Sequence, residues 1–166
     1  DRFVMVRRAA LADIPGLLVL LEQLFALEED YQFDTEKHTR AFEQLIPRDN
    51  AYVFVAEIEG RVVGMCSVQT VISTAQGSLS GWVEDVVVLD ECRNCGIGRK
   101  LMDALEQWAK ASGVTRLQLL ADVDNNQAIN FYQNNDWTLM HSVAMRKYIR
   151  KEKEIRNKLR FRLRRD

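Results

Sequence analysis

The stretch WVEDVVVLDECRNCGIGRKLMDALEQWAKASG, residues 82–113, is the most informative part of the sequence. It opens with an apolar run that Glu84 and Asp85 interrupt, and it closes with apolar residues at helical spacing. Between these segments lie Gly96 and Gly98, which let backbone N–H groups approach a ligand closely. The N–H groups of such a loop and of the following helix can converge on a phosphate. The stretch predicts a strand, a candidate phosphate-binding loop and a helix, with an ordinary tight turn as the alternative for the loop.

The sequence on either side predicts a single α/β domain. A helix is expected from an N-cap at Asp13 to Phe25, because Pro15 suits a first turn and leucines recur at helical spacing. Residues 73–81 are expected to form a polar loop. Further helices are expected at about 35–46, 98–112 and 125–132. Strands are expected at 4–6, 52–56, 61–72, 82–89 and 116–121, with two closing strands at 137–141 and 143–148.

Composition narrows the class of protein. The chain has 166 residues, 47% hydrophobic and 28% charged, which fits one domain with a packed core and excludes a disordered protein. No apolar run is long enough to span a bilayer, and the first residues lack the apolar stretch of a secretory signal. We therefore expect a cytoplasmic protein that does not contact membranes.

The charge is distributed unevenly. Residues 1–145 carry 12 Lys and Arg against 21 Asp and Glu, whereas residues 146–166 carry 11 against 3. The acidic body predicts a cationic, amine-bearing substrate. The basic tail predicts an anionic partner or contact with a second copy in a homodimer, with a disordered extension as the alternative.

The three cysteines are expected to be ordinary thiols. An odd number of cysteines in a chain of this length favours a reducing compartment. Cys92 and Cys95 have the spacing of a redox pair or of half a zinc site. Zinc requires about four ligands, and Cys66, His38 and His141 are scattered singly along the chain. We therefore expect no bound metal.

Two motifs resemble those of the GNAT superfamily of acetyl-CoA-dependent N-acetyltransferases. The loop that starts at Arg93 fits the R/Q-x-x-G-x-G/A signature, and residues 125–132, NNQAINFY, resemble the N-x-x-A-x-x-F-Y segment. Asn94 and Asp136 depart from the pattern where glycine is common, and Asp90 departs where proline is common. The resemblance covers about residues 3–148. It implies one N-acetyltransferase domain over 1–148, with a mixed, mostly antiparallel sheet flanked by helices, and a basic extension over 149–166.

The resemblance also implies where acetyl-CoA binds. Backbone N–H groups of the loop would hold the pyrophosphate, and a strand backbone would pair with the pantetheine arm. Asn125 matches a residue that contacts the cofactor arm, and Tyr132 matches a tyrosine that protonates the departing thiolate. The implied cofactor-binding residues are Val86, Val87, Val88, Arg93, Asn94, Cys95, Gly96, Ile97, Gly98, Arg99 and Asn125.

Glu84 and Asp85 are the candidates for the catalytic base. Ionised side chains among valines are costly unless they are paired or face a cleft. Because adjacent strand residues point to opposite faces, at most one of the two is expected to reach the reaction centre. We favour Glu84 as the base or as the binder of the substrate ammonium; pairing with Arg or Lys across the sheet is the alternative for either residue.

Other residues have simpler interpretations. A buried core tyrosine is the alternative for Tyr132, and His38 and His141 are expected to be surface or core residues. The acidic segment from Glu28 to Tyr31 could line an amine site, although a solvated helix end is favoured.

The sequence thus predicts an enzyme that moves an acetyl group from acetyl-CoA to a primary amine of a small molecule or protein by direct attack. Two other classes of function remain as alternatives. One is an acetyl-CoA-binding sensor without turnover. The other is a module that binds nucleic acid through its tail, which is not favoured because only Tyr148 and Phe161 could stack on bases.

Overall fold

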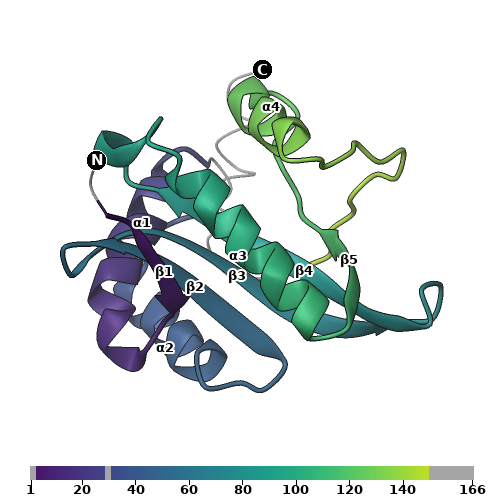
Figure 1. Cartoon of the computed structure of the whole chain (residues 1–166), viewed down its shortest axis with the longest axis horizontal. Helices are drawn as coiled ribbons and strands as arrows, with labels where there is room; N and C mark the ends of the chain where they lie inside the picture. Colours follow the sequence, from purple (N-terminus) through teal and green to yellow (C-terminus); the bar gives the residue numbers. More distant parts are fainter. Residues whose placement is uncertain (1–2, 29–30, 150–166) are drawn as a thin grey trace.

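The computed structural model describes residues 3–28 and 31–149. Figure 1 shows one domain built on a five-stranded sheet in the order β1-β2-β3-β4-β5. The strands are β1 (Met5–Arg8), β2 (Ala51–Ile58), β3 (Arg61–Ser73), β4 (Ser78–Val88) and β5 (Val114–Gln118). The helices are α1 (Ile14–Ala26), α2 (Thr35–Leu45), α3 (Ile97–Ala111) and α4 (Asn126–Asn134), with short 3-10 turns at Leu11–Asp13 and Asp90–Cys92.

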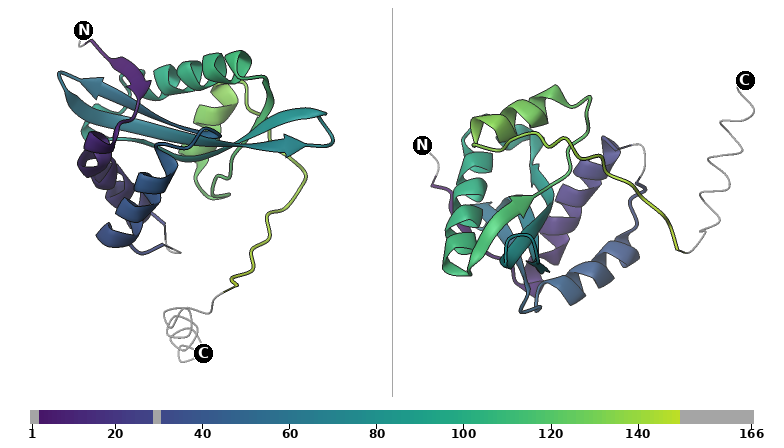
Figure 2. Two further views of the ribbon diagram at one scale, coloured as in Figure 1. Left: turned by 90° about the horizontal axis from the view of Figure 1, so that it is seen from below. Right: turned by 90° about the vertical axis from the view of Figure 1, so that its right-hand side faces the viewer.

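The domain has three layers. Neighbouring strands pair antiparallel except β4 and β5, which run parallel. Figure 2 shows α3 on one face of the sheet and α1 and α2 on the other. Parallel strands need a crossover connection, and α3 supplies it between β4 and β5. The strand–loop–helix predicted from residues 82–113 is therefore the central unit of the fold.

Local sequence explains the ends of the helices. Pro15 lies in the first turn of α1, where its missing N–H removes no helical hydrogen bond. The Asp34 side chain caps α2 by accepting the Lys37 N–H at 3.1 Å. After α3, Gly113 adopts a φ of 75°, which suits glycine and ends the helix before β5.

The core lies on both faces of the sheet. Its buried side chains are mainly aliphatic and come from the strands, α1 and α3; the largest are Leu17, Leu20, Met65, Ile97, Leu101, Met102 and Leu105. Burying each of these side chains stabilises the fold by roughly 1.5–3 kcal/mol before the entropy cost is subtracted. Among the described helices, none is long and apolar enough to cross a membrane.

Two expectations about the sheet are wrong. The segment 73–81 is mostly strand rather than loop, because β3 and β4 form a long hairpin whose turn is only 74–77. The strands expected at 137–141 and 143–148 do not form, and Figure 2 shows this part of the chain leaving the sheet as an extended segment. Alternating apolar residues predict a strand, but a strand also requires a hydrogen-bonding neighbour. Leu139 and Met145 stay 70% and 93% exposed. The basic tail, for which a partner contact or a disordered extension is expected, lies outside the described residues from residue 150 onward.

A half-buried ion-pair network fastens the start of the chain. The Arg7 guanidinium donates two hydrogen bonds of 2.8 Å to Asp13 and further bonds of 3.0 and 3.2 Å to Glu57 of β2. Hydrogen bonds from Arg7 hold the pKa of Asp13 below its usual value. The network joins β1, β2 and the turn that precedes α1, so it fixes where α1 enters the fold.

Replacing Arg7 by Ala should lower the free energy of unfolding at pH 7 by about 2 kcal/mol, because the Asp13 and Glu57 carboxylates would lose their charged partner. The pKa of Asp13 is lowered in the folded state, so this contribution is present above about pH 4 and is lost as the pH falls and Asp13 is protonated. Urea unfolding of the wild type and the variant at pH 7 and at a pH well below 4 measures this loss of the Arg7 contribution.

The matched control is Arg61→Ala, which removes an exposed ion pair of 2.7 Å with Glu91. Exposed pairs contribute about 0–1 kcal/mol. Equal destabilisation by the two substitutions would contradict the structural importance of the Arg7 network.

Candidate functional site

The loop before α3 ends in backbone N–H groups that open the helix. Asn94 and Gly96 have φ values of 60° and 77°, which turn the chain sharply into the helix. The first i→i−4 hydrogen bond of α3 runs from the Lys100 N–H to the Gly96 carbonyl at 3.1 Å. The N–H groups of residues 97–99 therefore have no acceptor within the helix, and they add to the positive end of its dipole. This loop has the donor chemistry of an anion site.

Gly98 has a packing role that the sequence did not reveal. A Cβ atom at this position would lie 3.0 Å from the Phe131 ring of α4. The absent side chain thus allows α4 to pack against the first turn of α3. Asn125 caps α4, because its side chain accepts the Ala128 N–H at 3.0 Å. Gly98 thus permits the contact between α3 and α4, and Asn125 stabilises the start of α4.

A β-bulge interrupts β4 beside the two candidate carboxylates. Ser67 of β3 pairs with Glu84 and Met65 pairs with Val87, so Cys66 faces two residues of β4 instead of one. Asp85, in the bulge, has a φ of 54°. The bulge breaks the alternation that is expected of adjacent strand residues, so Glu84 and Asp85 line the same pocket instead of opposite faces.

The end of β4 diverges from β5. The last pair of their parallel ladder is Trp82 with Gln118, so residues 86–88 lie beyond it. Gln23 of α1 ties this end down: its side-chain amide donates to the Val88 carbonyl at 2.9 Å and accepts the Asp90 N–H at 3.0 Å. One side chain therefore links α1, the end of β4 and the start of the loop before α3.

A cavity of about 430 Å³ lies between α1, α2 and the strands β3 and β4. We call it the carboxylate pocket; its walls include Leu21, Phe25, His38, Phe42, Glu84 and Asp85. The volume suits a small molecule. Glu84 is exposed, and its carboxylate accepts a hydrogen bond of 2.8 Å from the Trp82 indole N–H. Asp85 is half-buried.

Burial and negative neighbours change the acidity of Asp85. Loss of solvent around its carboxyl, with the charges of Glu84 and Glu28, raises the pKa of Asp85 to about 7. A carboxyl group with this pKa exchanges protons near neutral pH, as a general base must. Of the two candidate bases, Asp85 has the more suitable environment, although the sequence favours Glu84.

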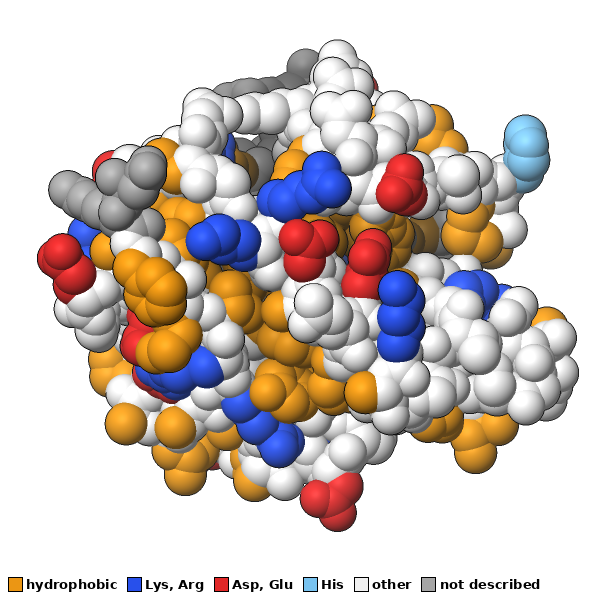
Figure 3. Space-filling model, in the orientation of Figure 1, with side chains coloured by type: hydrophobic (Ala, Val, Ile, Leu, Met, Phe, Trp, Pro, Cys, Tyr) orange, Lys and Arg blue, Asp and Glu red, His pale blue; other side chains and the backbone are white. Residues whose placement is uncertain are grey.

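Tyr132 does not line the carboxylate pocket. It lines a second groove of about 970 Å³ between β5, the end of α3, α4 and the segment that follows. Figure 3 shows hydrophobic side chains in the hollow between that segment and α3. Burial, with the Cys66 thiol nearby, raises the pKa of Tyr132 to about 12, so its hydroxyl is protonated at neutral pH. Since Cys66 faces the bulge, Tyr132 and Asp85 approach the same stretch of β3.

The structure places His38 in the same pocket as the two candidate carboxylates. The sequence favours a surface or core role, yet His38 lines the carboxylate pocket and its Nε2 atom is buried without a hydrogen-bond partner. A lone histidine in a charged helix carries no pattern that would identify it. His141, by contrast, is exposed.

The three cysteines are not joined by a disulfide in the described structure. Cys66 and Cys92 are buried and Cys95 is exposed, and all are free thiols. Burial raises the pKa of Cys66 to about 12, which keeps the thiol protonated. No group of three metal-ligating side chains occurs within residues 3–28 and 31–149.

Comparison with known proteins gives consistent matches. The profile of the acetyltransferase (GNAT) family matches residues 19–137. An uncharacterized N-acetyltransferase of Archaeoglobus fulgidus is 29% identical over 133 residues, 79% of this chain and 90% of that protein. Aminoalkylphosphonate N-acetyltransferase of Salmonella typhimurium is 25% identical over 136 residues, 82% of this chain and 86% of that protein.

A solved structure is similar along nearly the whole chain. It is an aminoglycoside acetyltransferase from an uncultured soil metagenomic sample, in complex with sisomicin. Its TM-score is 0.73 at 26% identity, and the alignment covers 90% of this chain and 97% of that one.

The environment of Asp85 predicts a pH-dependent stability. Its pKa is higher in the folded protein than the value of about 3.9 in an unfolded chain, so the folded state binds the proton more tightly between about pH 4 and pH 7. The Asp85→Asn variant should therefore gain stability relative to the wild type as the pH rises through this range, by on the order of 2 kcal/mol at pH 8. Chemical unfolding at pH 5 and pH 8 measures the difference.

A second variant tests the cause. Glu84→Gln removes a negative neighbour and should lower the pKa of Asp85, as followed by NMR titration of the carboxyl carbon. An Asp85 that titrates near pH 4 in the wild type would contradict the description of this pocket.

Proposed function

Since the chain belongs to the GNAT family of acetyltransferases, we propose that it transfers the acetyl group of acetyl-CoA to a primary amine bound in the carboxylate pocket. The observation that carries the proposal is Asp85, a carboxyl group with a pKa of about 7 at the bulge of β4. Asp85 lies close in sequence to a loop suited to an anion. The strand β4 would therefore position both the amine and the cofactor.

We assign the loop before α3 to the pyrophosphate of acetyl-CoA. The residues fit such a group: unsatisfied N–H groups open α3, and the space beside Gly96 is clear, since a Cβ there would have no neighbour within 4 Å. Residues 93–99 would hold the phosphates, and the backbone of residues 86–88, beyond the β5 ladder, would hold the pantetheine arm. Asn125 already caps α4, so we assign it to shaping this region as well as to contacting the arm.

Asp85 is assigned as the general base. An amine enters the pocket as an ammonium, and it must lose a proton before its lone pair can attack the thioester carbonyl. Asp85 accepts that proton, directly or through water, and Glu84 holds the positive charge nearby. Two carboxyl groups face one guanidinium, that of Arg48, on the pocket wall, and this balance favours a cationic acceptor, in keeping with the excess of Asp and Glu over residues 1–145.

Tyr132 is assigned as the proton donor. Acetyl-CoA would supply an activated acetyl group, and CoA would leave as the thiolate. The new C–N bond forms from the amine lone pair, and the C–S bond breaks with its electron pair on sulfur. The Tyr132 hydroxyl protonates that sulfur and then regains a proton from water. Its raised pKa keeps the hydroxyl protonated until this step.

The acceptor belongs to a broad class of small cationic amines. A related structure carries an aminoglycoside, and a related enzyme is named for aminoalkylphosphonates. Both names describe small amines, for which a pocket of about 430 Å³ has room. An acetyl-CoA sensor without turnover is the alternative, and acetylation of any amine by the purified protein excludes it.

The anion loop can be tested by a pair of substitutions at one position. Gly96→Asp places a negative charge where the phosphates are proposed to bind, whereas Gly96→Asn has the same shape without the charge. Both residues tolerate a positive φ better than other side chains do. The Asp variant should bind CoA at least about 10-fold more weakly than the Asn variant, and added salt should reduce the difference. Calorimetry with CoA measures both affinities, and equal affinities would contradict the assignment.

The acid and the base can be separated by kinetics. Asp85→Asn should lower kcat/KM by about 10²- to 10⁴-fold and abolish the rise in rate as the pH increases through about 7. Tyr132→Phe should lower kcat while leaving the affinity for CoA nearly unchanged. Initial rates with a free-thiol readout measure both effects. A loss below about 5-fold in either variant would contradict the role assigned to that residue.

A further inference from the structure

The groove that Tyr132 lines has a strand with a free edge along one side. Within the described residues, β5 pairs with β4 on one edge and with no strand on the other. Its outer edge therefore offers backbone N–H and carbonyl groups to a further strand. The groove beside this edge is largely apolar, and its walls include Leu117, Leu119, Ile129 and Trp137. It has both the edge and the surface that a strand requires.

The chain also contains an extended segment that lacks a neighbour. The backbone of residues 138–145 forms no backbone hydrogen bond with another described residue. From residue 143 onward, alternate positions are mainly apolar and very exposed: Val143 is 84%, Met145 93% and Ile149 89% exposed. Lys147 shares this face, and its aliphatic stem can lie along an apolar wall. Alternation of this kind is typical of a strand that buries one face.

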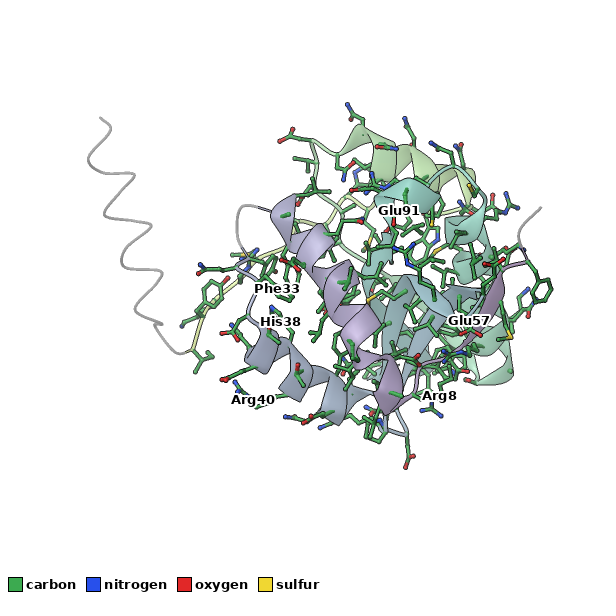
Figure 4. All side chains as sticks on the ribbon, turned by 90° about the vertical axis from the view of Figure 1, so that its left-hand side faces the viewer. Arg8, Phe33, His38, Arg40, Glu57 and Glu91 are labelled. Carbon is green, nitrogen blue, oxygen red and sulfur yellow. The ribbon has the colours of Figure 1, made fainter. Side chains whose placement is uncertain are left out.

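The segment 143–149 does not fill the groove of its own chain. Residues 137–144 form the wall of that groove opposite β5. The chain then continues toward Tyr31, and the Arg146 guanidinium lies 5.8 Å from the centre of that ring. Figures 2 and 4 show the end of the described chain projecting away from the body of the domain. A strand in the groove must therefore come from elsewhere, and a second copy carries one with the required pattern.

We propose that two copies of the chain exchange residues 143–149, each laying this segment along β5 in the groove of the other. Because the exchange is reciprocal, the assembly closes as a symmetric dimer in which both β5 edges are paired. Val143, Met145 and Ile149 then face the apolar walls. The proposal does not depend on the proposed function. It does place the partner's segment over the groove that Tyr132 lines.

The size of the contact suits a stable dimer. An extended chain exposes about 1.45 Å² per dalton, so the seven residues of the segment expose on the order of 1,200 Å². Covering half of this area, and an equal area of groove, in both copies removes roughly 2,000 Å² from water. Stable interfaces bury about 1,200–2,000 Å² in total. The exchanged segment alone therefore supplies an interface of sufficient size.

The charge of the chain favours contact between copies. Residues 1–145 carry 12 Lys and Arg against 21 Asp and Glu, whereas residues 146–166 carry 11 against 3. The charged residues that line the groove are two acids and two bases, so they are balanced. The attraction therefore acts between the acidic body of one copy and the basic end of the other, which the exchange brings together.

The mass of the protein in solution tests the proposal. Analytical ultracentrifugation of the full chain should give the mass of two chains. Met145→Glu places a charge on the face that enters the groove, so it should weaken the dimer by at least about 100-fold. Because Met145 is 93% exposed in a single copy, the variant should keep the fold of the domain, which circular dichroism checks.

Ile72→Glu is the matched control. Ile72 is 83% exposed near the end of β3 and does not line the groove. This substitution should leave the dissociation constant of the dimer within about 2-fold of the wild-type value. A wild type that stays monomeric at about 0.1 mM would overturn the proposal. Equal effects of the two substitutions would overturn it as well.

A contact between labelled copies identifies the exchanged segment. Copies labelled in methionine methyl groups are mixed with copies labelled in leucine methyl groups, so a nuclear Overhauser effect between the two labels arises only between copies. The exchange predicts such an effect from Met145 to Leu117 or Leu119 of the other copy. A dimer without it would overturn the proposal, because the copies would then associate through another surface.

Discussion

Asp85 has a left-handed backbone conformation in the middle of a strand, where L-amino acids rarely adopt it. Such a conformation costs on the order of 1–3 kcal/mol and persists only because the surrounding sheet enforces it. It produces the bulge in β4, and the bulge turns two adjacent carboxylates into one pocket. The ladder with β5 has already ended at Trp82, so the bulge lies in the part of β4 that β5 does not cover. The common orientation of the two carboxylates thus has a backbone origin.

The same strand leads into the loop before α3, which connects the two halves of the proposed reaction. Gln23 holds the end of β4 and the first residue of the following turn, so α1 is joined to both. Because α1 also forms a wall of the carboxylate pocket, the proposed amine site and the proposed anion site share α1 as a support. Rigid support of this kind keeps reacting groups aligned, which is a large part of the advantage of an enzyme.

Much of the fold could be predicted because its signals are local. Helical spacing, Pro15 and the glycine loop indicate the positions of α1, α3 and the crossover within a few residues, whereas Asp13 stands at the N-cap position of α1 without a side-chain capping bond. The two closing strands could not be predicted correctly, since apolar alternation does not tell whether β5 offers a neighbour. In the site, the two carboxylates within an apolar strand identified Glu84 and Asp85 as candidates. Their common orientation could not be predicted, because no residue type at these positions indicates a bulge. The place of His38 in the pocket could not be predicted for a related reason: its contacts with the Phe25 and Phe33 rings arise only on folding.

The close contact between Gly98 and Phe131 has a consequence for the divergence of related sequences. A Cβ atom at position 98 would meet that ring at 3.0 Å, so a methyl group there requires the ring to yield by a few tenths of an ångström. The two positions are therefore constrained jointly rather than one at a time. Related sequences with a larger residue at position 98 should carry a smaller or shifted side chain at position 131. A glycine that is typical of a ligand-binding loop is therefore required here, in part, by a helix–helix contact.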